Sequence, residues 1–460
     1  LRMSSADDLG QHIVVQGGTF HNDAVLRAFE QELGRNVTRP TIAGIMGAFG
    51  AALAAKELHL DKSAILSQEE LKTFQHSAKP ITCNGCTNHC SLTVNLFDGG
   101  RRFISGNRCS KPLGGKKTEM PDMFHYKYKK LRAMEGKGSG DGSRGRMGIP
   151  FGLNMYENLP FWFTLFTTLN FEVVLSPEST RSLYLKGQQT IPSDTVCYPA
   201  KLLHGHIMAL LEEGIDTIFY PCMSYNNDEG IGDNHYNCPV VAYYPELLAA
   251  NVPALKKTKF LDPYVGLWRH KDCAKRLSEL FYTEFGISKK ETKAAVEAAY
   301  DAYNAYVEDI HKTGEQYIEE ARAQGKPIIV MAGRPYHIDP EINHGINDLI
   351  TSFGFVLITE DTLAYREGYE TRTVLNQWTF QSRMYNAARY VCTQKDMQMV
   401  QLVSFGCGTD AITTDELRSI LETGGKLYTQ LKIDDITNLG AVKIRIRSLM
   451  AAMDARKEAK

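Results

Sequence analysis

Apolar and polar positions repeat with two periods along most of the chain, and this predicts strands that alternate with helices. Short apolar runs such as Met147–Phe151 and Ile328–Ala332 have the length and composition of buried strands, and 159–169 has a helical pattern. Strands that alternate with helices indicate parallel sheets covered by helices on both faces. We therefore expect an α/β protein with two Rossmann- or flavodoxin-like units, at 147–250 and 326–450.

The remaining parts of the chain predict four further segments. They are an N-terminal piece at 1–60, a four-cysteine β-hairpin module at 75–134, a Gly/Ser-rich linker at 135–146 and a helical connection at 251–325. The helical connection contains a long amphipathic stretch, 290–324. We interpret its aromatic stripe as core and not as part of a cofactor site; the stripe consists of Val296, Tyr300, Tyr303, Val307 and Ile310.

Charge and composition narrow the class of protein. The 460 residues carry 52 basic and 53 acidic side chains, which gives no general attraction to nucleic acid or to an anionic membrane. No apolar run reaches the roughly 18 residues of a membrane span, and the first residues lack the apolar core of a signal peptide. We expect a cytoplasmic protein with reduced cysteines, and we interpret the start, Leu1–Ser5, as a cut end.

Four of the ten cysteines form one compact motif, Cys83-x2-Cys86-x3-Cys90-x18-Cys109. Alternation in the sequence after Cys90 and the Asp-Gly-Gly turn at 98–100 predict a β-hairpin that returns the last cysteine to the others. Four thiolates bind either Zn²⁺ or the irons of a [4Fe–4S] cluster, and the ligand type alone does not separate the two.

Three further cysteines lie where loops lead out of predicted strands or into predicted helices. They are Cys197, Cys222 and Cys407, and Cys238 is a fourth candidate; the Thr413–Glu416 capping-box pattern predicts a helix start after Cys407. In open parallel sheets, ligands bind beyond the carboxyl ends of the strands. Three thiols that converge there could hold an iron–sulfur cluster and leave one iron open. Taken alone, each cysteine is better interpreted as a small buried apolar residue. The polar and turn-forming neighbours of Cys197, Cys222 and Cys407 argue against that interpretation for these three.

Charged residues near these cysteines are candidates for binding an anion or a cluster. Lys201 follows Cys197 by one helical turn, and Arg334 follows a predicted strand; a surface salt bridge is the alternative for Arg334. His204 and His206 lie on the predicted helix after Cys197 and are interpreted mainly as helix-surface histidines.

The cysteine motifs together resemble the large activase-related proteins of the 2-hydroxyacyl-CoA dehydratase and benzoyl-CoA reductase system, including double-cubane cluster proteins. The resemblance covers nearly the whole chain. The motifs that carry it are CNGCTNHC (83–90), GGRRFISGNRC (99–109), SDTVCYPAKLLHGH (193–206), FYPCMSY (219–225), NCPVV (237–241) and SFGCGTDAITTDE (404–416).

Residues 12–56 resemble the C-terminal end of the family's activator ATPase domain, which has the actin/Hsp70-like fold. In that likeness Gly17 and Gly18 match the glycine turn that contacts the nucleotide. The phosphate-binding loops would lie upstream, so ATP is expected only in a longer parent protein.

The resemblance implies that Cys197, Cys222 and Cys407 hold a [4Fe–4S] cluster or half of a bridged [8Fe–9S] double cubane, while Cys238 has no assured counterpart. It implies a homodimer that accepts ATP-driven, low-potential electrons from the activator ATPase. The electrons would pass to an acyl-CoA or to another small molecule. The alternatives are a non-catalytic, Zn²⁺-binding scaffold or partner subunit and, with least support, an ordinary α/β transferase or hydrolase.

Overall fold

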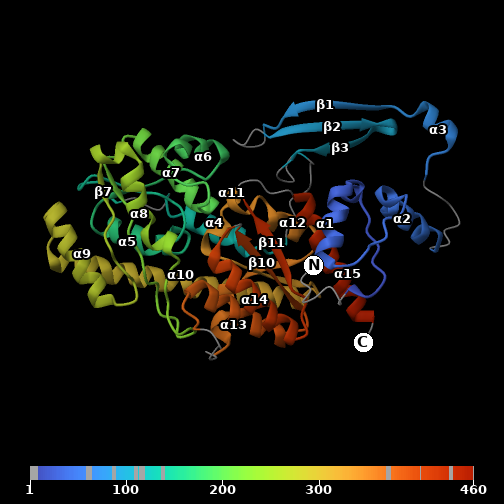
Figure 1. Ribbon diagram of the computed structural model, residues 1–460. Coiled ribbons are helices and arrows are strands. Elements are labelled where there is room, and N and C mark those ends of the chain that lie inside the picture. Colours follow the sequence, from blue (N-terminus) through green and yellow to red (C-terminus); the bar gives the residue numbers. More distant parts are fainter. Residues whose placement is uncertain are drawn as a thin grey trace. The chain divides into compact units, whose positions relative to one another are not determined.

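A computed structural model describes residues 9–57, 65–84, 90–107, 112, 120–135, 140–368, 375–404, 406–434 and 439–458. The chain forms two compact units, one of Leu1–His76 with Phe97–Gly99 and one of Ser77–Leu96 with Gly100–Lys460 (Figure 1). Within the described residues, no helix is both long enough and apolar enough to cross a bilayer.

The first unit contains three α-helices: α1 (Asp23–Leu33), α2 (Met46–Glu57) and α3 (Gln68–Thr73). Helix α1 begins where the Asn22 side chain accepts a hydrogen bond from the amide of Ala24, and it ends at Gly34, whose φ of 63° is left-handed. The apolar run near Val14 forms only a single parallel bridge to Thr38. An actin-like origin for these elements stays a prediction.

A three-stranded sheet lies in the four-cysteine region, in the order β1 (His76–Thr82), β2 (Ser91–Phe97), β3 (Arg101–Ser105). The predicted hairpin is present as β2 and β3, and its turn uses Gly99 and Gly100 at positive φ. Strand β1 was not predicted, because its sequence HSAKPIT lacks apolar alternation and every residue in it is exposed.

Two four-stranded parallel sheets form the body of the second unit. One has the order β5-β4-β6-β7, and the other has the order β11-β10-β8-β9. In each, the first strand along the chain pairs with both the second and the third, so a topological switch point lies beside it. The strands are β4 (Arg146–Ile149), β5 (Glu172–Leu175), β6 (Thr217–Phe219), β7 (Lys259–Leu261), β8 (Ile328–Ala332), β9 (Val356–Thr359), β10 (Met397–Ser404) and β11 (Thr429–Ile433).

The prediction of an α/β protein with parallel sheets is thus confirmed, whereas the finer Rossmann- or flavodoxin-like assignment stays a prediction. Strand β7 (Lys259–Leu261) was not predicted and lies beyond residue 250, where the first α/β unit is expected to end. Its three residues are too few for a strand pattern to be seen in the sequence.

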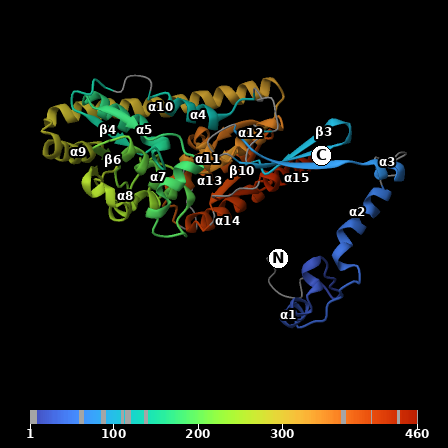
Figure 2. The ribbon, with the colours of Figure 1, turned by 90° about the horizontal axis from the view of Figure 1, so that it is seen from above.

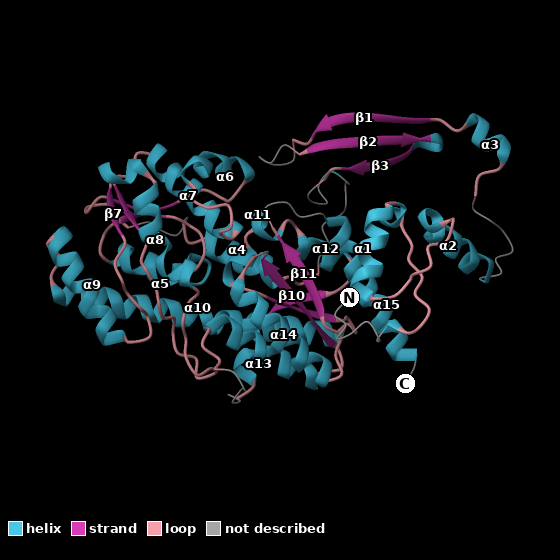
Figure 3. Cartoon of the chain, viewed as in Figure 1, coloured by secondary structure: helices cyan, strands magenta, loops and turns pink. Residues whose placement is uncertain are grey.

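Helices surround both parallel sheets (Figure 3). The longest, α10 (Lys289–Ala323), matches the predicted stretch to within one residue and runs past both sheets (Figure 2). Its buried stripe packs on α5 (Met155–Thr168), and the two sheets share one hydrophobic core. The other helices are α4 (Met123–Arg132), α6 (Arg181–Gly187), α7 (Tyr198–Glu212), α8 (Pro239–Asn251), α9 (His270–Phe285), α11 (Pro340–Asn343), α12 (Ile346–Ser352), α13 (Thr379–Thr393), α14 (Gly408–Thr423) and α15 (Leu439–Glu458).

The predicted capping box at Thr413–Glu416 was wrong. Helix α14 begins at Gly408 with Cys407 as its N-cap, so this sequence lies inside the helix. The Thr413 hydroxyl instead donates to the carbonyl of Thr409 at 2.7 Å, as buried threonines inside helices commonly do.

Helix α4 is joined to the second α/β unit by a buried ion pair between Lys127 and Asp361, whose side chains are 5% and 17% exposed. Burial alone would raise the pKa of Asp361, but the charges of Lys127 and Arg383 lower it to about 2. The aspartate is therefore charged at neutral pH and depends on its partner.

We predict that Lys127→Met lowers the free energy of unfolding by about 3 kcal/mol, because it leaves a buried carboxylate without its cation. Urea unfolding measures the change. Lys312→Met is the matched control, since Lys312 pairs with Glu308 on the exposed face of α10 and its loss should leave the midpoint unchanged. Equal midpoints for the two variants would show that the buried pair contributes nothing.

Candidate functional site

Three cysteines occupy the N-cap position of three different helices. Cys197 begins α7, Cys238 begins α8 and Cys407 begins α14. In α/β units the helix N-termini lie at the carboxyl edge of the parallel strands, so each thiol lies at that edge. The positive end of the helix dipole favours a thiolate over a thiol at such a position.

The charges of these three thiols act on one another across the two α/β units. Burial, with smaller contributions from Cys238 and Cys407, raises the pKa of Cys197 to about 12, whereas Arg334 acts to lower it. Burial also raises the pKa of Cys238, with Arg334 and Cys407 again acting on it in opposite directions. Cys197 and Cys238 belong to the first α/β unit, whereas Cys407 and Arg334 belong to the second α/β unit.

Arg334 places a permanent positive charge beside Cys407. It follows β8, is 4% exposed, and pairs with Asp410 of α14 at 2.6 Å. Its guanidinium also donates to the Thr409 hydroxyl at 3.0 Å and approaches the Cys407 Sγ at 3.8 Å. The pair is buried, so the alternative of a surface salt bridge for Arg334 was wrong.

Cys222 lies in a loop and not at a helix N-terminus. It follows β6, is 1% exposed, and its amide donates to the carbonyl of Pro263 at 2.9 Å. Burial, together with the carboxylates of Asp262 and Glu246, raises its pKa to about 12. Its charge acts on Tyr220, as do the charges of Cys238 and Cys197, so its part in a site with them stays a prediction.

A sequence signal could have separated these cysteines. Cys197 and Cys238 are each followed within two residues by a proline, in Cys-Tyr-Pro and Cys-Pro. Proline is favoured in the first turn of a helix, so both patterns predict a cysteine at a helix N-terminus. In FYPCMSY, by contrast, the proline precedes Cys222.

The histidines and the lysine near Cys197 are occupied within the protein. His204 lies between Thr190 and the Tyr244 hydroxyl, at 2.7 and 3.0 Å, and is fully buried, so its interpretation as a helix-surface histidine was wrong. Lys201 donates to the carbonyl of Asp194 at 2.7 Å. These side chains therefore position the start of α7 and do not present free groups to a ligand.

His206 is also buried, and the surface interpretation was wrong for it too. Its two ring nitrogens bond to the hydroxyls of Ser176 and Ser179 at 2.8 and 3.0 Å. Burial lowers its pKa to about 3, so it is neutral at pH 7.

The four-cysteine motif is only partly covered by the structure. The amide of Cys83 donates to the carbonyl of Cys90 at 2.8 Å, which brings the ends of β1 and β2 together. Cys86 and Cys109 lie outside the described residues. Among the residues that the structure does describe, no group of three or more His, Cys, Asp or Glu side chains could hold a metal ion. The choice between Zn²⁺ and a cluster at this motif stays open.

A backbone hydrogen bond holds the glycine turn of the N-terminal compact unit, Leu1–His76. Gly17 has a φ of 98°, which favours glycine, and its amide donates to the carbonyl of Ala43 at 2.8 Å. Gly18 begins a short 3-10 helix that ends at His21. Nucleotide contact at Gly17 and Gly18 stays a prediction.

The buried His206 leads to a pH-dependent prediction. An unfolded histidine has a pKa near 6.5, whereas the folded one titrates only near pH 3, so the unfolded state gains the proton first as pH falls. Stability should therefore fall between pH 7 and pH 5, by about 2 kcal/mol from this group alone. His206→Gln should shrink the difference in unfolding free energy between the two pH values.

The measured quantity is the difference between the free energies of unfolding at pH 7 and at pH 5. A loss of packing in the variant lowers both values equally and therefore does not affect this difference. His125→Gln is the control, because His125 is exposed on α4 and its replacement should leave the difference as it is. An unchanged pH dependence in His206→Gln would contradict the assignment of a buried neutral ring.

One comparison with known proteins bears on this region. Residues 146–363 match the family model described as CoA enzyme activase uncharacterised domain (DUF2229), and a search of curated proteins finds no match. The matched segment runs from β4 to the end of the β9 region and includes Cys197, Cys222, Cys238 and Arg334. Residues 146–363 of the chain are therefore similar to a domain of CoA enzyme activases.

Proposed function

We propose that this chain is an iron–sulfur electron carrier of a CoA enzyme activase-related system, with a cluster held between its two α/β units by Cys197, Cys238 and Cys407. The observation that carries the proposal is that three cysteines occupy helix N-cap positions in the two α/β units, and that one of them, Cys407, lies beside the buried Arg334. The relation of residues 146–363 to CoA enzyme activases supports it.

The donor chemistry fits a cluster better than a single ion. A lone Zn²⁺ needs all its ligands within about 2.3 Å of one centre, and no such group exists among the described residues. In a cubane each thiolate binds its own iron, so the sulfur atoms lie farther apart. The charges of Cys197, Cys238 and Cys407 act on one another, as expected for thiolates that bind different irons of one cluster.

The protein supplies charge compensation for thiolates at this place. Burial alone keeps the Cys197 and Cys238 thiols protonated, which is why their pKa values are raised. Three helix N-termini and the Arg334 guanidinium work in the other direction and favour the anionic form that binds iron. Asp410 holds Arg334 in place, at 2.6 Å. The carboxylate therefore fixes the position of the charge that faces the Cys407 sulfur.

Buried aromatic side chains lie near the thiols. Tyr336 and Tyr220 are each 4% exposed, and the charges of both Cys197 and Cys238 act on each of these rings. Apolar surroundings are one of the means by which a protein sets the reduction potential of a cluster. When bound, the cluster would supply one-electron transfer and one iron without a protein thiolate, open to an acceptor.

The remaining parts of the proposal concern partners. The electron donor would be an activator ATPase, and the acceptor would be an acyl-CoA or a small molecule reduced at low potential. Gly17 and Gly18 would contribute to a nucleotide site of that ATPase. The four-cysteine motif that begins at Cys83 would hold a second cluster or Zn²⁺, and two copies of the chain would form a homodimer.

The proposal predicts iron and acid-labile sulfide in anaerobically purified protein, at about four irons for the site between the units. Cys238→Ser and Cys407→Ser should each lose that iron together with its visible charge-transfer absorption. Cys222→Ser should keep it, because the proposed ligands are the three cysteines at helix N-caps and Cys222 is not one of them. Cys392→Ser serves as the control, since its thiol faces the carbonyl of Ile420, away from the site.

All variants are best made in a Cys83→Ser/Cys90→Ser background, so that iron at the four-cysteine motif does not contribute to the count. The proposal fails if this background contains zinc alone, or if Cys238→Ser retains the iron of its parent. Zinc alone would favour a structural relative that lacks electron transfer.

A further inference from the structure

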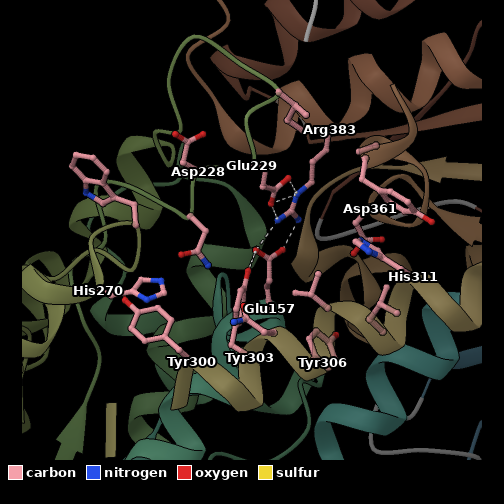
Figure 4. A pocket seen from close by; sticks show the side chains of 18 residues that line it. Glu157, Asp228, Glu229, His270, Tyr300, Tyr303, Tyr306, His311, Asp361 and Arg383 are labelled. Carbon is pink, nitrogen blue, oxygen red and sulfur yellow. Dashed lines mark hydrogen bonds and ion pairs between the residues drawn. The ribbon is translucent and has the colours of Figure 1, made fainter. Parts of the chain in front are cut away.

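A cavity of about 340 Å³ lies between the two α/β units, and none of the cysteines discussed above lines it. Its floor is α10, which contributes Tyr300, Tyr303 and Tyr306, and Arg383 of α13 faces them from the other unit (Figure 4). The aromatic stripe that the sequence assigned to the core is therefore partly the wall of a cavity. This volume is at the small end of ligand pockets in proteins.

Arg383 is not available to bind an anion in this cavity. Its Nε donates to both carboxylate oxygens of Glu229 at 2.9 Å, and its two terminal nitrogens donate to Glu157 at 2.5 and 3.0 Å. Both carboxylates are thus bound to one guanidinium (Figure 4). The two carboxylates and the single guanidinium together have a net charge of −1.

The other charged groups make the cavity more negative. Asp228 and Asp361 also line it, and only Asp361 has a buried cation, Lys127, as its partner. The four carboxylates in the cavity wall are balanced by only two cations, Arg383 and Lys127, so the net charge is −2. Burial lowers the pKa of His311, so this ring adds no positive charge at neutral pH. A phosphate, a carboxylate or the nucleotide part of CoA would be repelled here.

The side chains that line the cavity are suited to binding an organic cation. Trp268, Tyr300, Tyr303, Tyr306 and Tyr365 all line the cavity, together with the apolar Ile231, Val307 and Ile310. The faces of aromatic rings attract organic cations, and the apolar side chains favour the hydrocarbon part of a ligand.

One buried polar group in the wall lacks a partner. The Tyr306 side chain is 7% exposed, and its hydroxyl makes no hydrogen bond to any residue that the structure describes. Buried hydroxyls are nearly always hydrogen-bonded, so an unpaired one beside a cavity indicates a group that completes it. The phenol oxygen accepts hydrogen bonds, and an ammonium N–H is a donor.

We propose that this cavity is a binding site for a small organic ammonium compound, held by the carboxylates around Arg383, the aromatic wall of α10 and the Tyr306 hydroxyl. The site goes beyond electron transfer and does not depend on a cluster. It gives the chain a second ligand, of opposite charge to an acyl-CoA, at the contact between its two α/β units.

Isothermal titration of the full, anaerobically purified chain tests the proposal with 1,4-diaminobutane, ethanolamine and choline as the probes. At least one of these should bind, and binding should weaken with added salt. Neither 1,4-butanediol, which has the shape but no charge, nor succinate, which has the opposite charge, should bind. No binding by any of the three ammonium compounds, or binding by succinate, would overturn the proposal.

Two variants place the binding at this cavity. Tyr306→Phe should weaken binding about tenfold, as expected for the loss of a hydrogen bond to a charged group, and Asp228→Asn should weaken it through the lost charge. The matched controls are Tyr282→Phe and Asp415→Asn, because both side chains are exposed and outside the cavity. Binding that is unchanged in both cavity variants would place the ammonium site elsewhere and refute the assignment.

Discussion

Helix α10 is the constraint on which the arrangement of the two α/β units depends. Its buried stripe packs on α5 of the first α/β unit, and it also contacts β9 of the second α/β unit. A Cβ at Gly314 would lie 2.6 Å from side-chain atoms of Thr362, so glycine there lets the helix approach the second unit closely. One rigid helix of 35 residues therefore sets the distance and orientation between two sheets.

This arrangement makes the carboxyl edges of the sheets face a shared space, where polar groups from both units pair. The Tyr198 hydroxyl donates to Glu341 at 3.0 Å, and both Tyr156 and Ser179 donate to Asp339. Burial raises the pKa of Asp339, while the two donors lower it. Such directional contacts fix the position of one α/β unit against the other better than apolar packing alone.

The sequence predicted those features that depend on local pattern. Alternation and helical period located the strands of both parallel sheets, except β7 and β11, and placed α10 to within one residue. Strand β1 was missed because its exposed sequence has no period, and the capping-box pattern at Thr413 was overridden by the helix start at Cys407. The association of Cys407 with Cys197 and Cys238 depends on how the two α/β units meet, which no local pattern contains. The cavity above α10 is built from several separate segments and was invisible for the same reason.

The central claim is that a cluster lies among three helix N-termini at the contact of the two units. Anomalous X-ray scattering at the iron edge, from crystals grown without oxygen, tests it most directly. The account predicts an iron peak within bonding distance of the sulfur atoms of Cys197, Cys238 and Cys407. Iron that appears only at the motif of Cys83 and Cys90, or iron bound by Cys222 while Cys238 stays free, would contradict it.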